Sequence, residues 1–136
     1  MNKDIELLLV LFEHFNKVVG RTRLQKIVFL LQNKFNIKFS YKFISYYYGP
    51  YSKDLQFEVN LLNAMGMINV SAGDGVYIHT LSEKGVTTTK EIIEQRKDDP
   101  EIKELISRLD YFRDKDTSSL IIEAKNLIKN PETLFK

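Results

Sequence analysis

The sequence predicts an α+β protein that is mostly helical. Three observations lead to this: three helical segments lie within the first 65 residues, two short apolar segments flank an Asp-Gly pair, and helical periodicity returns from residue 84. Three helices followed directly by a β-hairpin are the element order of a winged helix-turn-helix core, with the hairpin as the wing. We therefore expect a winged core over residues 1–82 and a helical C-terminal extension over residues 83–136. The two parts are expected to form one structural unit, because no linker separates them.

Capping signals mark the predicted helices. Thr22 and Gln25 have the spacing of a capping box, and Ser52 is the expected N-cap of the third helix. Asp99 followed by Pro100 is a typical helix start. The first helix is apolar on nearly every face, as a helix in the centre of a core would be. The predicted helices span residues 5–15, 22–34, 53–65, 84–97 and 101–113, and a last one starts at residues 116–119.

Aromatic residues are concentrated before the third helix. Nine of the sixteen Phe and Tyr residues lie within residues 35–57, and alternation over residues 39–43 favours an extended strand whose aromatic side chains pack inward. Gly-Pro is expected to end this strand in a turn. That structural turn consists of Tyr48, Gly49, Pro50, Tyr51 and Ser52. Two further strands, residues 67–70 and 76–81, form the predicted hairpin.

Composition excludes several classes of function. Without cysteine, the chain has no disulfide, zinc ribbon, iron–sulfur cluster or thiol catalysis. His14 and His79 have no acidic or histidine neighbours at ligand spacing, and phosphate-binding loops, dinucleotide fingerprints and nucleophile elbows are missing. We therefore expect no enzymatic activity, no metal and no cofactor. The apolar run over residues 7–12 is too short for an export signal or a membrane helix, which predicts a cytoplasmic protein without a membrane partner.

Two sequence segments resemble a known family. Gly-Arg-Thr-Arg-Leu-Gln-Lys-Ile-Val-Phe-Leu-Leu-Gln at residues 20–32 and Tyr-Tyr-Tyr-Gly-Pro-Tyr-Ser at residues 46–52, with Leu55, resemble the YwgA-like family of small prokaryotic winged-helix proteins. They are more distantly similar to the Panacea (SocA-like) antitoxin domains. The resemblance covers about residues 5–85. It implies a winged-helix fold without known catalytic activity, in proteins described as regulators or as antitoxins that neutralise partner proteins.

The first hypothesis is a winged-helix protein that binds double-stranded DNA and regulates transcription. The first 51 residues carry eight Lys or Arg against three Asp or Glu, although the whole chain has a net charge of only +2. The expected phosphate contacts are Arg21, Arg23 and Lys26. The expected base contacts are Lys53, Gln56 and Asn60, on the outward face of the third helix. The alternatives are a solvated helix face and surface ion pairs to the acidic tail.

The second hypothesis is a protein-binding module, antitoxin-like or an adaptor, that does not bind DNA. Phe57 lies opposite the buried stripe of the third helix and needs a cover. We expect the C-terminal helices to supply it, and a protein partner is the alternative. The tyrosine cluster is expected to be structural rather than a platform for stacking bases. The predicted wing tip, residues 72–75, carries no Lys or Arg. The apolar stripes of the C-terminal helices must bury against the core or against a second copy of the chain, and we expect a homodimer.

Overall fold

The computed structural model describes residues 1–128. The fold is α+β and mostly helical, as predicted, with two small antiparallel sheets among the described residues. The elements are α1 (Lys3–Phe15), β1 (Lys17–Val19), α2 (Arg21–Asn33), β2 (Ile44–Tyr46), β3 (Gly49–Tyr51), α3 (Lys53–Ala64), β4 (Ile68–Gly73), β5 (Val76–Leu81), α4 (Glu83–Gln95), α5 (Pro100–Leu109), the short 3₁₀ helix η1 (Asp110–Phe112) and α6 (Thr117–Ile128). No helix in residues 1–128 has the length and apolar run that crossing a membrane requires.

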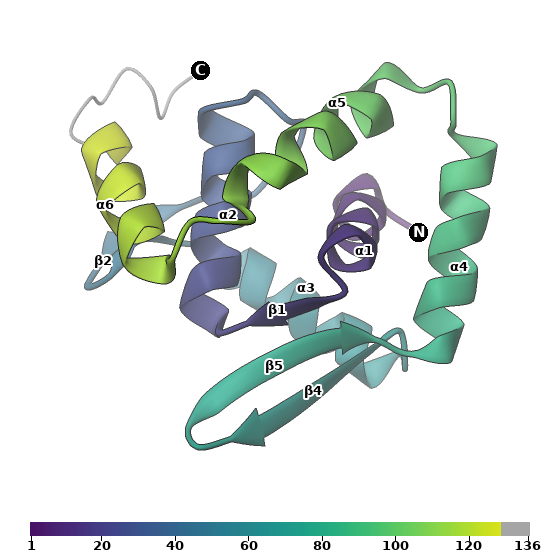
Figure 1. The fold of residues 1–136 in the computed structure, drawn as a ribbon, viewed down its shortest axis with the longest axis horizontal. Helices are drawn as coiled ribbons and strands as arrows, with labels where there is room; N and C mark the ends of the chain where they lie inside the picture. The colour runs from purple at the N-terminus through teal and green to yellow at the C-terminus, as the bar shows by residue number, and fades with distance from the viewer. Residues whose placement is uncertain (129–136) are drawn as a thin grey trace.

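Helix α1 forms the centre of the core, as its apolar sequence predicts. Every residue from Leu7 to Phe12 is buried. Figure 1 shows α1 end-on in the middle of the molecule, with α4 and α5 around it, and both helices contact it. The helix has no solvated face over this stretch because other elements surround it, which is why its sequence lacks an amphipathic stripe.

Strand β1 is absent from the sequence prediction, which left residues 16–21 between two helices. It pairs with β5, opposite Ile78–Thr80, so that β1, β5 and β4 form one antiparallel sheet. Three residues carry too little pattern to predict a strand, and their hydrogen-bond partners lie about sixty residues away in the chain. Asp74 and Gly75 close the β4–β5 hairpin with φ of 54° and 76°, as the Asp-Gly pair predicts.

The predicted strand over residues 39–43 is wrong. Phe39 and Tyr41 are buried as expected, but the backbone there belongs to no sheet. Instead, the Gln32 side-chain amide donates to the Tyr41 carbonyl oxygen at 2.8 Å and accepts from the Tyr41 N–H at 3.2 Å. A side chain thus satisfies the backbone groups that a neighbouring strand would otherwise satisfy.

The Gly-Pro pair is also not the turn. Gly49 and Pro50 begin β3, which pairs with β2, and the turn between these strands consists of Tyr47 and Tyr48. Gly49 has φ of 96°, in the region that glycine adopts readily, and it lies opposite Tyr46. The aromatic segment therefore folds back on itself just before α3 instead of running straight into it.

The capping box at the start of α2 does not form. Gly20 is the N-cap residue, and no side chain caps this helix end. The Gln25 side-chain amide donates a hydrogen bond to the Ser52 carbonyl oxygen and accepts one from the Ser52 N–H, both at 2.8 Å. The Ser52 hydroxyl accepts from the Leu55 N–H and caps α3. Gln25 therefore positions the start of α3 against the middle of α2.

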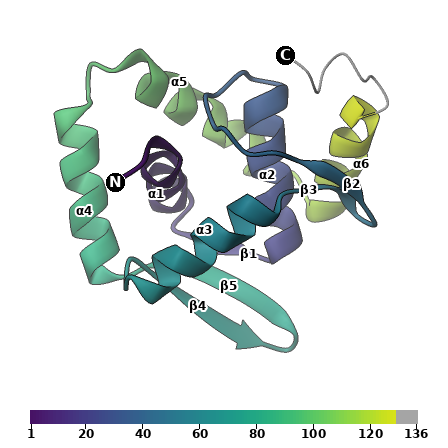
Figure 2. The same cartoon turned by 180° about the vertical axis from the view of Figure 1, so that it is seen from behind.

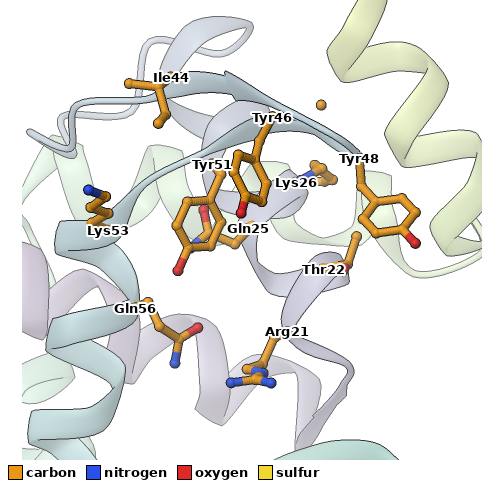
Figure 3. Close-up of a pocket in the computed structure, with 11 residues that line it drawn as sticks. Arg21, Thr22, Gln25, Lys26, Ile44, Tyr46, Tyr48, Tyr51, Lys53 and Gln56 are labelled. Atoms are coloured by element: carbon orange, nitrogen blue, oxygen red, sulfur yellow. The ribbon is translucent and has the colours of Figure 1, made fainter.

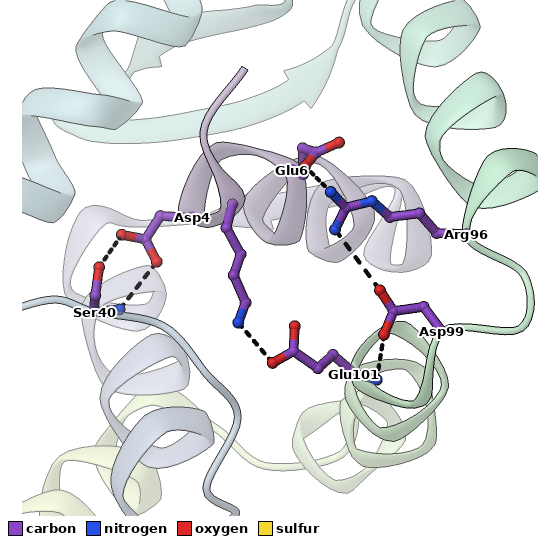
Figure 4. A network of polar contacts seen from close by, with 7 residues as sticks. Asp4, Glu6, Ser40, Arg96, Asp99 and Glu101 are labelled. Carbon is purple, nitrogen blue, oxygen red and sulfur yellow. Dashed lines mark hydrogen bonds and ion pairs between the residues drawn. The ribbon is translucent and has the colours of Figure 1, made fainter.

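The C-terminal helices pack on the rest of the chain. Helices α4 and α5 contact α1, whereas α6 contacts α2 and β3. The predicted helix over residues 101–113 is shorter, because α5 gives way to η1 at Asp110. Two ion pairs join α1 to this region: Lys3 with Glu101 at 2.6 Å, and Glu6 with Arg96 at 2.8 Å. Figure 4 labels the second pair.

Candidate interaction surface

A cavity of about 460 Å³ opens between α2, the β2–β3 hairpin and the start of α3. In Figure 3 the rings of Tyr46, Tyr48 and Tyr51 lie toward the hairpin, while Arg21 and Gln56 lie at the opposite end. The volume lies within the range of about 300–1,000 Å³ that is common for ligand sites. The cavity is lined by Arg21, Thr22, Gln25, Lys26, Ile44, Tyr46, Tyr48, Gly49, Tyr51, Lys53 and Gln56.

A second cavity of about 230 Å³ continues the first one along α3 toward β5. Arg21 and Gln56 line both cavities. We call the two together the α2–α3 groove. None of its lining residues within residues 1–128 carries a carboxylate. The remaining residues of the second cavity are Val59, Asn60, Asn63, Val70, Tyr77 and His79.

The three residues predicted to contact bases lie on one side of α3. Lys53 and Asn60 are exposed, Gln56 is half-buried, and the Gln56 amide donates to the Asn60 side-chain oxygen at 3.1 Å. Arg21 is exposed beside them, with its guanidinium 3.9 Å from the centre of the Tyr77 ring. Seen from behind in Figure 2, α3 runs from the β2–β3 hairpin to the β4–β5 hairpin. The polar row therefore starts beside the β2–β3 hairpin and extends along α3 toward the other hairpin.

The three cations predicted to contact phosphates do not form one patch. The Arg23 guanidinium donates to the carbonyl oxygens of Phe112 and Lys115, at 2.9 and 2.7 Å. Lys26 is only 2% exposed, and burial lowers its pKa to about 8. Two of the three charges are thus directed toward the protein's own backbone, and Arg21 alone of the three faces the groove as an exposed side chain. Helix periodicity places the three side chains in different directions around α2. Arg23 packs against η1 and the segment after it, and Lys26 packs against β3.

Exposed aromatic rings lie beside the groove. Tyr46, Tyr47 and Tyr48 are 58%, 83% and 63% exposed, so these three rings lie outside the core. Phe57 is 66% exposed, and the expectation that the C-terminal helices cover it is wrong for residues 1–128. Helices α4 and α5 instead pack on α1, and α6 on α2 and β3.

Phe57 belongs to a row on α3. Leu61 and Met65 follow it at intervals of four residues and are each 37% exposed. We call Phe57, Leu61 and Met65 the α3 stripe. Lys53, Gln56 and Asn60 lie on the groove side of this helix, so α3 presents a polar row next to an apolar one. The sequence contains this pattern, but only the packing of the other helices shows that the apolar row stays uncovered in the described chain.

The histidines and acidic residues form no metal centre in the part of the chain that the structure describes. The His79 ring is buried, with Nδ1 3.0 Å from the Val18 carbonyl oxygen, and desolvation lowers its pKa. His14 instead pairs with Asp110 at 2.7 Å. Each imidazole is thus engaged within the fold, and the chemistry of the surface rests on cations, amides and tyrosine rings.

Comparison with curated proteins finds a match to "Uncharacterized protein YwgA" of Bacillus subtilis (strain 168), 28% identical over 89 residues. The match covers 62% of this chain and 53% of YwgA, so the chain spans about half the length of this relative. No family model matches the chain, and no solved structure matches it. The chain therefore has a distant and partial similarity to YwgA. The similarity to Panacea domains stays a prediction from the sequence.

Proposed function

We propose that this chain is a protein-binding module on a winged-helix scaffold. Its contact surface would consist of the α3 stripe and the β2–β3 hairpin, residues 44–51, which we call the tyrosine hairpin. The observation that carries the proposal is the exposure of Phe57 together with Tyr46, Tyr47 and Tyr48. The three tyrosines lie at the β2–β3 turn directly before α3, and Phe57 lies on that helix. Large exposed apolar patches are uncommon on monomeric proteins and mark interaction sites. Tyrosine and phenylalanine are enriched where proteins meet.

The winged-helix part of the proposal rests on element order and sheet topology. Three helices precede the β4–β5 hairpin, and β1 joins that hairpin in a three-stranded sheet. One feature departs from the usual motif, because residues 34–52 separate α2 from α3 where three or four residues are typical. That insertion forms the tyrosine hairpin, so the departure itself creates part of the proposed surface.

Site-specific photo-crosslinking in native cells tests the proposal. A benzophenone amino acid in place of Tyr47 or Phe57 should give one discrete protein adduct, because both side chains are exposed. The same amino acid in place of Glu91, exposed on α4, is the matched control and should give none. Adducts that contain nucleic acid only, or no difference from the Glu91 control, would contradict the proposal.

Double-stranded DNA is the second candidate, and the row of Lys53, Gln56 and Asn60 beside Arg21 favours it. Amide side chains pair with adenine edges, and a groove without carboxylates tolerates phosphates. Such a protein would act as a transcriptional regulator. Fluorescence anisotropy with pooled genomic duplexes should then show binding that falls steeply between about 50 and 200 mM salt. Arg21→Glu and Gln56→Ala should weaken this binding, while unchanged affinity in both would exclude this surface.

Self-association is a separate proposal for α6. Ile122 is 61% exposed on the face of α6 turned from the core, which supports the predicted homodimer. Light scattering should then give twice the monomer mass, and Ile122→Glu should return the monomer. A monomer mass for the wild-type chain would rule the dimer out.

A further inference from the structure

We infer that the α2–α3 groove accepts an acidic segment of the partner protein. The inference rests on the proposed function, since it names the chemistry of the partner that the exposed surface would bind. Three features of the groove carry it: its charge, its wall of tyrosines and the separation of its charges from the acidic residues of α3.

The charge of the groove is positive over its described lining residues. Arg21 and Lys53 are exposed and come from different helices, so that a bound segment would meet one cation from each side. Lys26 lies beneath them, and its ammonium donates a hydrogen bond to the Pro50 carbonyl oxygen at 2.9 Å. None of the lining residues within the described chain supplies a carboxylate to neutralise these groups. A ligand with carboxylates would therefore complement the groove.

The acidic residues of α3 point elsewhere. Asp54 and Glu58 flank the α3 stripe, on the side away from Gln56 and Asn60 by helix periodicity. Glu58 accepts a hydrogen bond from the Asn2 side chain at 2.9 Å, which keeps its carboxylate toward the N-terminus of α1. The helix thus separates its negative side from the groove, and repulsion of an acidic ligand is small.

The tyrosines give the groove an aromatic wall, which the binding of a simple inorganic anion would not require. Tyr46 and Tyr51 lie with their ring centres 5.5 Å apart, and Ile44 lines the same wall. Rings of this kind supply large contact area at low cost in side-chain entropy, and their hydroxyls can donate to carboxylates. A peptide combines carboxylates with apolar side chains and so matches both halves of the lining. Among the described residues that line the groove, duplex DNA would meet two exposed cations, and residues 72–75 at the tip of the β4–β5 hairpin include no Lys or Arg.

Selection from a displayed library of random twelve-residue peptides tests the inference with the full chain as bait. The most enriched peptide is then synthesised with a fluorescein label and titrated. Arg21→Glu and Lys53→Glu reverse one groove charge each, and both residues are exposed, so thermal unfolding should confirm that the variants fold. Lys97→Glu is the matched control, because Lys97 is an exposed lysine remote from the groove. A Tyr46→Ala, Tyr48→Ala variant tests the aromatic wall.

We expect enriched peptides to be rich in Asp and Glu and to weaken about tenfold for each reversed charge, with no change for Lys97→Glu. The double tyrosine variant should weaken binding as well. Peptides without acidic enrichment, or affinity that is unchanged by Arg21→Glu, would overturn the inference. Binding of a short DNA duplex through Arg21, without binding of acidic peptides, would also overturn the inference. The same holds if peptides bind only when a dimer of this chain dissociates.

The proposed function and the inference of an acidic segment can fail separately. A discrete protein adduct at Tyr47 together with an absence of acidic enrichment would leave the protein-binding proposal standing and remove the acidic segment. Absence of adducts from native cells together with acidic peptides whose binding depends on Arg21 would show that the groove has the inferred chemistry and that the proposed function is wrong.

Discussion

The Lys26 ammonium nitrogen lies 2.9 Å from the Pro50 carbonyl oxygen, to which it donates a hydrogen bond. This bond joins the middle of α2 to β3, beneath the tyrosine hairpin. The side chain is almost fully buried, and Lys125 of α6 lies nearby. A cation that sequence reasoning placed on the surface is instead an internal contact, with consequences for stability.

Stability should rise with pH because of Lys26. Burial, with a contribution from Lys125, lowers the pKa of Lys26 from 10.5 to about 8. Between these values the unfolded chain holds a proton that the folded chain has released, so raising the pH favours folding. From pH 7.5 to 9.5 the free energy of unfolding should increase by about 2 kcal/mol relative to Lys26→Met. Urea denaturation at each pH measures this difference, and Lys97→Met should behave as the wild type does.

Gly49→Ala should destabilise the protein more than Gly75→Ala. Both glycines have positive φ, 96° and 76°, which costs an alanine about 1–2 kcal/mol. At Gly49 the added methyl group would also lie 3.4 Å from Lys26 and Lys125 carbons, whereas at Gly75 it would meet nothing within 4 Å. Thermal unfolding of the two variants separates backbone strain from crowding. Equal loss in both would show that the contact at Gly49 has no cost.

Arg23→Met should cost about 1–3 kcal/mol, because it leaves the Phe112 and Lys115 carbonyl groups without their guanidinium donor. Arg21→Met should cost less than about 1 kcal/mol, since Arg21 is exposed and loses only its contact with the Tyr77 ring. Chemical denaturation measures both. Peptide or DNA binding should show the opposite order, with Arg21 the more important residue, and a larger binding loss from the Arg23 variant would contradict this assignment.

Stability should fall as the pH drops below about 6.5 because of His79. Desolvation lowers the pKa of this buried ring, so below the usual histidine pKa the unfolded chain takes up a proton that the folded chain refuses. The slope from this one group is at most about 1.4 kcal/mol per pH unit. His79→Gln should reduce the slope between pH 7 and 5.5, and His14→Gln, at the other histidine, should retain the His79 contribution. An unchanged slope in His79→Gln would show that another group is responsible.

Local signals in the chain were sufficient for several elements. The caps Ser52 and Asp99 each bond the backbone of the following helix, and Asp74-Gly75 closes its hairpin. Each of these depends on residues within four positions of one another. The predictions that failed depend instead on residues that are far apart in the sequence. Gln25 has a capping-box spacing to Thr22, yet its amide bonds Ser52, 27 positions away, because burial there offers two backbone partners at once.

The candidate surface divides in the same way. Helical periodicity correctly placed Lys53, Gln56 and Asn60 on a side of α3 away from Leu55 and Val59, which are buried. The same reasoning could not distinguish the exposed Arg21 from Arg23 and Lys26. The orientation of these two side chains depends on where η1, the segment after it and β3 pack. It also misjudged Phe57, whose exposure follows from the positions of three helices that come later in the chain.

The sequence by itself determined which segments are helical, that Ser52 and Asp99 cap α3 and α5, and which helix lies in the centre. These properties arise from hydrogen bonds and apolar spacing within a turn or two of the chain. The tertiary structure alone decided that β1 exists, that Lys26 and Arg23 face inward, and that the tyrosine hairpin and Phe57 remain uncovered. Those outcomes depend on contacts between residues far apart in sequence, whose geometry is settled only when all the helices pack together.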